Sequence, residues 1–330
     1  MHGADHHNAR TLSIVTLEQL RGFVTIAATG HFTRAAERLH VAQPTLSRQV
    51  STLEAELGHT LFHRIRGGVT LTTAGERLLP IARRMLADAE SARSEMAELA
   101  GLTTGRIRLG ATPTLATSLV VDVVAEFHER HPGVAIEIRE RGSRSLIAEL
   151  IEGSLDLALI VTTVASGAAR AVLELEPILT ERLVAVSAAA QPDPFAGRRG
   201  EAVSLRALAR APQVVFPESY DLRVATDAAF GRAGLQPEVV VEGVEMDAAL
   251  RFAERGMGVA VVPAMVAAQR PALRATPIAE PSLTRTVSIA RRSDMVPAHA
   301  SAALQERIRD VADRLAAPGG ETGGAVSRVR

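Results

Sequence analysis

The spacing of apolar residues changes near residue 104, and this change constrains the fold more than any other feature of the chain. From Leu17 to about Leu99 the apolar residues recur three or four positions apart, as they do in amphipathic helices. After Gly105, short alternating or apolar runs separate helical segments, which is typical of strands and helices in turn. Such alternation favours parallel strand pairing. We therefore predict a multidomain α/β chain with a helical N-terminal module, a linker helix and an α/β C-terminal domain.

The same patterns assign individual elements in the C-terminal part. We expect strands at 106–111, 134–140, 155–161, 183–187, 213–216, 238–242, 259–262 and 286–290, and helices at 118–130, 145–152, 222–233, 247–255 and 298–315. Residues 1–15 are polar and residues 318–330 are rich in glycine, so both ends are expected to be disordered.

Composition narrows the classes of function. The 330 residues carry 37 basic and 37 acidic side chains, so any contact with nucleic acid must rest on a local basic surface. The absence of cysteine from the sequence excludes disulfides, thiol nucleophiles and thiolate metal sites. No apolar run approaches the roughly 18 residues of a membrane-spanning helix, and the N-terminus lacks the pattern of a signal peptide. We expect a cytoplasmic protein that does not bind membranes.

The helix expected over 43–57 separates apolar from polar residues. Its apolar residues repeat at intervals of four, three and four and form one face, made of Leu46, Val50, Leu53 and Leu57. At about 100° per residue, Arg48 points away from that face. Short side chains share or flank the exposed side, namely Pro44, Thr45, Ser47, Ser51 and Thr52. Short residues with one arginine suit entry into the DNA major groove. The alternative is a three-helix packing module in which Arg48 is only solvated.

Two neighbouring segments belong to the same module. Thr33 is expected to be the N-cap of the preceding helix, because its hydroxyl can accept a hydrogen bond from a backbone N–H of the first turn. We also include it among the DNA-binding candidates. Residues 61–69 are typical of strand, turn and strand, a wing whose Arg64 and Arg66 can lie on the DNA backbone.

A long linker helix is expected to follow. Thr73–Glu76 has the pattern of a capping box. Downstream, apolar residues alternate at intervals of four and three, namely Leu78, Ala82, Met85, Ala89, Ala92, Met96 and Leu99. This narrow stripe favours pairing with the same helix of a second chain, and two-fold symmetry then predicts a partly palindromic DNA site. The alternative is a helix that packs on its own chain.

Hydroxyl groups mark the candidate ligand site of the C-terminal domain. In a two-lobed α/β domain, ligands bind at the C-terminal ends of strands, between the lobes. The first expected strand ends just before Thr112 and Thr114, and hydroxyls at a helix N-terminus suit a carboxylate or phosphate. The alternative role of each residue is capping or turn formation.

Two other classes of function have less support. An enzyme would need a nucleophile, metal or phosphate motif, and the sequence has none that we recognise. His2, His6 and His7 cluster only in the polar N-terminal segment, so we expect no metal, no cofactor and no catalytic residue. A secreted solute-binding protein would need an export signal and would have no use for a helix-turn-helix.

Consecutive motifs resemble the LysR-type transcriptional regulators. The resemblance is carried by LEQLRGF at 17–23, GHFTRAAERL at 30–39, AQPTLSRQV at 42–50, LEAELG at 53–58, LFHR at 61–64 and LTTAGE at 71–76. The rest of the chain extends it to about 15–316. It implies a winged helix-turn-helix, a dimerising linker helix, and a two-lobed effector domain shaped like a periplasmic binding protein.

The resemblance also implies residue roles and partners. Gln43, Pro44, Ser47 and Arg48 match positions that meet DNA, with Thr45 adjacent and Arg64 near phosphates. The full set of DNA-binding candidates is Thr33, Gln43, Pro44, Thr45, Ser47, Arg48, Ser51, Arg64 and Arg66. The implied partners are double-stranded DNA with a partly palindromic operator, RNA polymerase where the protein activates, and further copies in a homodimer or a dimer of dimers.

In the effector domain, Thr114 and Ser143 match positions that hold anionic effectors. Where some members carry a cleft arginine, this chain has Val161, which argues against a dicarboxylate. The candidate effector contacts are Thr112, Thr114, Ser143, Thr162 at the lobe crossover, Phe216 at a strand end, and Met246 and Asp247 at a helix start. An effector between the lobes is expected to favour one arrangement of the protein.

The expected domain boundaries follow from these assignments. The winged helix-turn-helix covers 16–72, the linker helix 73–104 and the effector domain 105–317. Within the effector domain, lobe I takes about 105–162 and 265–317, and lobe II about 163–264.

Overall fold

The computed structural model describes residues 15–99, 105–161, 171–195, 201–279, 282–317 and 324–329. Contacts divide the chain into an N-terminal unit, Met1–Arg93 with Glu152–Ser154, and a C-terminal unit made of the rest. The segments 1–14 and 318–323, which we expected to be disordered, lie outside the described residues.

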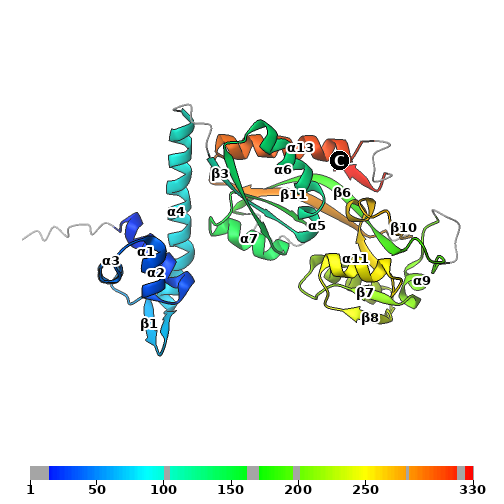
Figure 1. Cartoon of the computed structure of the whole chain (residues 1–330), viewed down its shortest axis with the longest axis horizontal. Coiled ribbons are helices and arrows are strands. Elements are labelled where there is room, and N and C mark those ends of the chain that lie inside the picture. The colour runs from blue at the N-terminus through cyan, green and yellow to red at the C-terminus, as the bar shows by residue number, and fades with distance from the viewer. Residues whose placement is uncertain are drawn as a thin grey trace, which may run out of the picture. The chain divides into compact units, whose positions relative to one another are not determined.

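The N-terminal unit has the element order of a winged helix-turn-helix. Helices α1 (Leu17–Thr29), α2 (Phe32–Leu39) and α3 (Gln43–Leu57) precede a hairpin of β1 (Phe62–Ile65) and β2 (Gly68–Leu71), and the long helix α4 (Thr73–Leu99) follows (Figure 1). The hairpin is antiparallel, with Phe62 opposite Leu71 and Ile65 opposite Gly68.

Helix boundaries follow from caps and left-handed residues. The Thr16 hydroxyl and the Gln19 side chain form a capping box at the start of α1, and Gly30 ends that helix at φ 68°. Helix α2 begins at Phe32, which packs against the core. The N-cap of α2 is therefore His31. Our expectation that Thr33 caps this helix was wrong.

An aromatic cluster holds the hairpin against the helices. The ring of Phe62 lies 5.3 Å from the ring of Phe23 on α1 and 5.9 Å from that of Phe32 on α2. Phe62 thereby joins two buried clusters, one around Leu20, Phe23 and Leu53 and one around Ile26, Leu46 and Val50. The hairpin is thus fixed on the three-helix core.

Helix α4 uses its first half to pack on the same unit. Its cap is Thr72, not the expected Thr73: the Thr72 hydroxyl accepts from Gly75 N at 3.0 Å and donates to Thr60 O at 2.7 Å. Ala82 is fully buried in the cluster around Phe23, and Leu78 packs there too. These two members of the expected intermolecular stripe therefore contact their own chain.

The C-terminal unit is a two-lobed α/β structure. The sheet of lobe I contains β3 (Gly105–Ala111), β4 (Val134–Glu140), β5 (Leu157–Val161), β11 (Thr284–Arg292) and residues 173–182 of β6 (Leu173–Ala188). Helices α6 (Leu119–Arg130) and α13 (His299–Leu315) cover one face and α7 (Ser143–Ile151) the other (Figure 1). The alternation of β5 fits these layers, because Leu157 and Leu159 face α6 and α13 while Ala158 and Ile160 face α7.

Lobe II continues from the second half of β6. Residues 183–188 of this strand pair with β9 (Ala260–Pro263) and β10 (Leu273–Pro277). Around them lie α9 (Leu205–Arg210), β7 (Gln213–Val215), α10 (Asp221–Arg232), β8 (Val239–Glu242), α11 (Met246–Glu254) and α12 (Ala264–Ala268). Their apolar residues form a separate core that includes Val214, Phe230 and Leu250.

Three expectations about this unit need correction. The main sheet is mixed: among its described strands, β3–β4 and β3–β5 are parallel pairs, whereas β6 and β11 run antiparallel to their neighbours. Lobe I includes 173–182, and lobe II extends to about 278, because β10 pairs with the second half of β6. Finally, β12 (Val326–Arg328) pairs with β6 and buries Val326, so this part of the tail is ordered.

Among the described helices, none combines the length and the apolar character that crossing a membrane requires.

Candidate nucleic-acid interface and interlobe pocket

Helix α3 presents a polar face because its apolar residues are used in the core. Leu46, Val50 and Leu53 are buried, and Leu57, expected on the same face, is 37% exposed at the end of the helix. Arg48 is exposed on the opposite side, and among the described residues no carboxylate forms an ion pair with it. Gln43, Pro44, Thr45 and Ser51 are also exposed, and Ser47 is half-buried. The hydrogen-bond donors and the positive charge of this face are therefore available to a binding partner.

The N-terminal end of α3 is held in place by the preceding turn. His40 adopts a left-handed conformation at φ 55°, which ends α2. Ala42 then starts α3, and its carbonyl accepts from Thr45 N at 3.0 Å and from Leu46 N at 3.2 Å. With Pro44 in the first turn, where its missing N–H is not needed, the helix start is free to approach phosphates. Thr33 is exposed near the start of α2.

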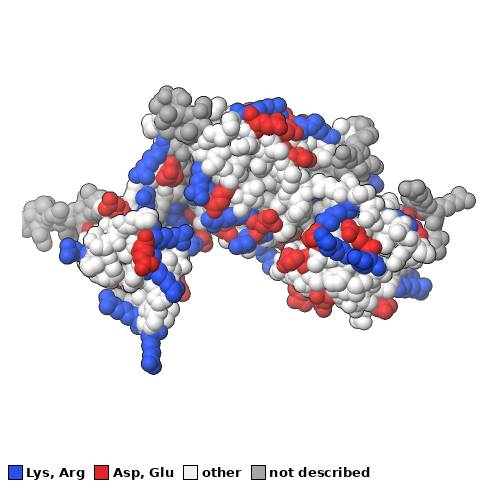
Figure 2. All heavy atoms as spheres, in the orientation of Figure 1, with Lys and Arg blue, Asp and Glu red and all other residues white. Residues whose placement is uncertain are grey.

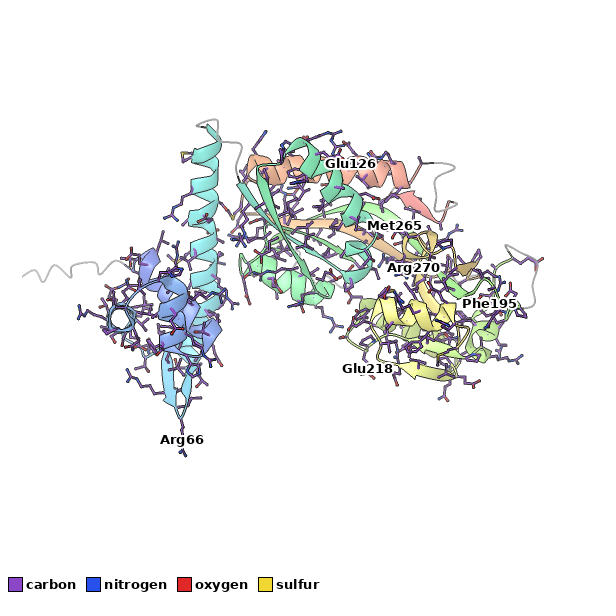
Figure 3. The ribbon with its side chains drawn as sticks, viewed as in Figure 1. Arg66, Glu126, Phe195, Glu218, Met265 and Arg270 are labelled. Carbon is purple, nitrogen blue, oxygen red and sulfur yellow. The ribbon has the colours of Figure 1, made fainter. Side chains whose placement is uncertain are left out.

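The hairpin is an exposed basic wing. Arg64 and Arg66 are exposed, and Gly67 provides the turn at φ 91°. Arg66 lies at the tip and points away from the helices (Figure 3), and basic side chains project from this tip (Figure 2). Two bonds fix the wing relative to the helices: Val69 N donates to Gly30 O at 2.8 Å, and Leu61 N donates to the Glu54 carboxylate at 2.7 Å. The wing and α3 therefore form one rigid surface.

A large pocket lies between the lobes of the C-terminal unit. Its volume is about 760 Å³, which is enough for a small organic molecule. Lobe I contributes Thr112 and Thr114, lobe II contributes Tyr220 and Leu222 from the start of α10, and Arg285 comes from β11. The other charged residues in the described part of its lining are Arg144, Arg232 and Asp221.

A buried ion pair forms part of the wall. The Arg285 side chain is 8% exposed and that of Glu181 is completely buried, and the two residues lie opposite each other on β11 and β6. Arg285 Nε donates to Glu181 Oε2 at 2.8 Å, and Nη1 donates to the Thr114 hydroxyl at 2.6 Å. The other carboxylate oxygen of Glu181 accepts from Met265 N at 2.7 Å. Met265 (labelled in Figure 3) belongs to α12, so this network joins β6, β11 and α12 to Thr114 at the pocket.

The expected effector residues occupy different environments. Thr112 and Thr114 line the pocket and their hydroxyl oxygens lie 3.3 Å apart. Ser143 is fully buried behind the wall: its hydroxyl accepts from Val161 N at 3.1 Å, and its backbone N donates to Asp221 at 3.1 Å. Thr162 lies outside the described residues.

The lobe II candidates do not line the pocket. Phe216 and Met246 are buried in the lobe II core, where the Phe216 ring stacks on that of Tyr220 at 5.9 Å. Asp247 is exposed and forms ion pairs with Arg270 and Arg251, whose hydrogen bonds lower the pKa of its carboxyl group. The structure therefore brings together Thr112 and Thr114 and leaves these three residues away from the pocket wall.

Several pocket residues escaped the sequence analysis. Arg285 shares its strand face with Val287 and Ile289, and a charge at a core-facing position of a strand is a signal that was available. No comparable pattern in the sequence pointed to Tyr220. Its hydroxyl donates to the Glu245 carboxylate; burial and this hydrogen bond raise the pKa of Tyr220 above its ordinary value, so the hydroxyl stays protonated.

No group of three His, Asp or Glu side chains in the described part of the chain is arranged to hold a metal ion.

Comparisons with known proteins identify both units. Residues 17–76 match the model of the bacterial regulatory helix-turn-helix protein, lysR family, and residues 100–313 match that of the LysR substrate binding domain. The chain is similar to the HTH-type transcriptional regulator IlvR of Caulobacter vibrioides, with 31% identity over 92% of this chain and 99% of that one. It is also similar to the nitrogen assimilation regulatory protein nac of Escherichia coli, with 34% identity over 76% of this chain and 78% of that one.

A solved structure agrees over most of the length. The full-length OxyR variant from Pseudomonas aeruginosa covers 90% of this chain and 94% of its own at 26% identity, with a TM-score of 0.70. With a winged helix-turn-helix whose polar helix face is exposed, a long linker helix and a two-lobed ligand-binding domain, the chain belongs to the LysR family and is a DNA-binding transcriptional regulator with an effector-binding domain, not an enzyme.

Proposed function

We propose that residues 16–72 recognise a specific operator by placing the exposed face of α3 in the DNA major groove. The observation that carries this proposal is Arg48, which is exposed opposite the buried Leu46 and Val50 and is not engaged in an ion pair within the described residues. An arginine presented in this way can donate two hydrogen bonds to a guanine edge. The short side chains beside it allow the helix backbone to come close to the bases. The remaining contacts are Gln43, Pro44, Thr45, Ser47 and Ser51, with Thr33 at the edge of the face.

The wing supplies contacts of another kind. Arg64 and Arg66 are exposed on a hairpin that is tied to α1 and α3, so they reach the phosphate backbone at a fixed distance from α3. Phosphate contacts add affinity and set the position on DNA without reading the sequence. Their contribution falls as salt is raised.

The linker helix, within 73–104, pairs two chains. Leu78 and Ala82 pack on their own unit, but further along the same stripe Met85 is 42% and Met96 60% exposed, and the adjacent Ile81 is 44% exposed. Apolar residues at this spacing are usually covered in a stable protein. A second copy of α4 would cover them and would place two DNA-reading units on one operator, which makes a partly palindromic site the expected target. Association of two such dimers, and contact with RNA polymerase at activated promoters, complete the proposed partners of this cytoplasmic protein.

The effector domain, 105–317, responds to a small molecule in the interlobe pocket. Three arginines and one aspartate are among the described lining residues, which favours an anion. Asp221 of lobe II lines the pocket and also accepts a hydrogen bond from Ser143 N of lobe I, so one residue contacts both the pocket and the opposite lobe. Because the sequence has no cysteine, thiol oxidation is not available as a signal. An effector that binds one lobe arrangement more tightly shifts the protein toward that arrangement.

The test is footprinting of upstream DNA with the full chain and its Arg48→Ala variant. Loss of one arginine–guanine contact costs about 1–3 kcal/mol, so we expect the variant to bind about 5- to 150-fold more weakly at a fixed salt concentration. Arg21→Ala is the matched control, because Arg21 is an exposed arginine on α1 outside the proposed face and its loss changes the net charge equally. Equal effects of both variants would show that α3 does not read the operator.

A further inference from the structure

The short strand β12 pairs with β6 at the place where β6 passes from lobe I to lobe II. The first half of β6 belongs to the sheet of lobe I, and the second half pairs with strands of lobe II. In β12, Val326 lies opposite Glu181, and just before it Ala325 O accepts a hydrogen bond from Arg182 N at 2.8 Å. We call residues 325–328 the strap; its strand is the red arrow near the end of the chain in Figure 1.

The strap packs against the hydrophobic cores of both lobes. Val326 is 3% exposed and belongs to the core of lobe I, together with Leu304 and Ile308 of α13. Ala325, the residue before it, packs against the core of lobe II. Adjacent Cα atoms are only 3.8 Å apart, so one short segment can keep both contacts only while the two cores keep the same relative position. The strap therefore favours the described arrangement of the lobes.

The strap also covers a buried charge. Glu181 is completely buried, and its two neighbours across the sheet are Arg285 of β11 and Val326 of the strap. Side chains directly opposite each other in antiparallel strands share one face of the sheet, so Val326 lies beside the Glu181 carboxylate. A carboxylate in place of Val326 would face that buried carboxylate, and two like charges in this position destabilise strand pairing.

The strap lies outside the residues that match the LysR substrate binding domain, since that match ends at residue 313. Its last contact with the matched region is the ion pair of Arg328 with Asp313 of α13. Both side chains are about half exposed, at 52% and 46%, so this ion pair contributes little. The apolar contacts of Val326 and Ala325, together with the pairing to β6, are what hold the strap in place.

We propose that the strap is a regulatory element that holds the two lobes in the described arrangement. An effector that binds another arrangement more tightly has to work against the strap, which raises the concentration at which it switches the protein. Removal of the strap then allows other arrangements to be populated without any effector. This inference goes beyond the proposed function, because it depends neither on the identity of the effector nor on the operator.

Distances between spin labels on the two lobes can test the proposal in the full chain. Because the sequence has no cysteine, labels can be attached to introduced cysteines without removal of native thiols. Glu129→Cys on α6 and Arg206→Cys on α9 place one label on each lobe, and both positions are exposed. Mixing labelled chains with an excess of unlabelled chains suppresses distances between chains.

Three altered proteins are compared with the unaltered one. Deletion of residues 318–330 should make the distribution of interlobe distances at least about twice as wide. Val326→Asp should widen it as well, because the new carboxylate lies beside Glu181. Ser327→Asp is the matched control, since it adds the same charge at the exposed neighbouring position and should leave the distribution unchanged. If the deletion prevents folding, the comparison of the two aspartate variants decides.

Hydrogen exchange of the same proteins checks whether the strap has left β6. The Arg182 amide is bonded to Ala325 O, so a peptide that contains residues 179–183 should exchange at least about tenfold faster after the deletion or in Val326→Asp. In Ser327→Asp the change should be less than about twofold.

The inference is overturned if exchange shows that the strap has been released while the interlobe distances stay as in the unaltered protein, because the strap would then only cover a sheet edge. Unchanged exchange after the deletion, or equal widening in both aspartate variants, would also overturn it. Operator footprinting with the deleted chain separates this failure from failure of the proposed function. Protection that still depends on Arg48, combined with unchanged interlobe distances, would contradict only the role of the strap.

Discussion

Gly75 lies where α4 closely approaches the start of the wing, and replacing it with alanine should loosen this junction. A Cβ on Gly75 would lie 2.3 Å from the backbone oxygen of Leu61 and 2.9 Å from Leu71 Cδ2. The first neighbour is backbone and cannot rotate away, so α4 or the start of β1 would have to move. The junction matters because Leu61 N is also bonded to Glu54 of α3.

The expected magnitude follows from two opposing terms. Alanine in place of glycine inside a helix gains about 1 kcal/mol of helix propensity. Overpacking costs about 1–3 kcal/mol and more where backbone has to move, so the net change should be about 2 kcal/mol of destabilisation. At Gly22 the nearest atom is the side-chain carbon Leu46 Cδ1 at 2.8 Å, so the two terms should nearly cancel. At Gly231 no atom of the described residues lies within 4 Å of the added Cβ, so Gly231→Ala should stabilise α10 slightly.

Hydrogen exchange followed by mass spectrometry on the intact chain can measure these three variants. For Gly75→Ala, amides of residues 16–93 should exchange about 30-fold faster, which corresponds to about 2 kcal/mol of local opening free energy. Gly22→Ala should change exchange by less than about fivefold, and Gly231→Ala should slow exchange in α10 only. If Gly75→Ala instead slows exchange in residues 16–93 as much as Gly231→Ala slows it in α10, the close approach of α4 to Leu61 is not present in solution.

Two further predictions concern association and pH. Met85→Arg should shift the protein from dimer to monomer in sedimentation analysis. Met257 of lobe II is exposed to a similar extent, and Met257→Arg should leave the dimer intact. Dimers in both variants would exclude pairing through this face of α4. The Arg309 hydrogen bond lowers the pKa of Glu176, so the pair stabilises the fold above the ordinary Glu pKa and this contribution is lost as pH falls through the lowered value. Both side chains are more than a third exposed, so Arg309→Met should cost less than about 1 kcal/mol at pH 7 and less still at pH 3 in urea titrations. An equal loss at both pH values would contradict this assignment.

Local patterns in the sequence were sufficient for the elements that place DNA contacts. The intervals between Leu46, Val50 and Leu53 predicted which side of α3 is buried, and the exposure of Arg48 follows from them. Helix starts were less predictable, because neighbouring hydroxyl residues compete for the cap. Thr72 rather than Thr73 caps α4, since only Thr72 can also bond Thr60 across the hairpin.

Long-range pairing could not be predicted from these patterns. The first half of β6 carries Glu174, Glu176 and Glu181 among its apolar residues, so it lacked a clean strand pattern, yet it pairs along its length with β11. The pocket was only partly predictable for the same reason. Thr112 and Thr114 follow a recognisable strand end, but Arg285 and Tyr220 reach the pocket from segments far away in the sequence.

The continuity of β6 limits how the two lobes can move. One strand belongs to both sheets, and an extended strand rising about 3.3 Å per residue has almost no slack to lengthen. The lobes can therefore turn about the strand near Arg182 but cannot slide apart along it. Binding of a molecule is therefore transmitted as a change in the angle between the two lobes. Any surface outside the pocket that responds to binding must respond to this rotation.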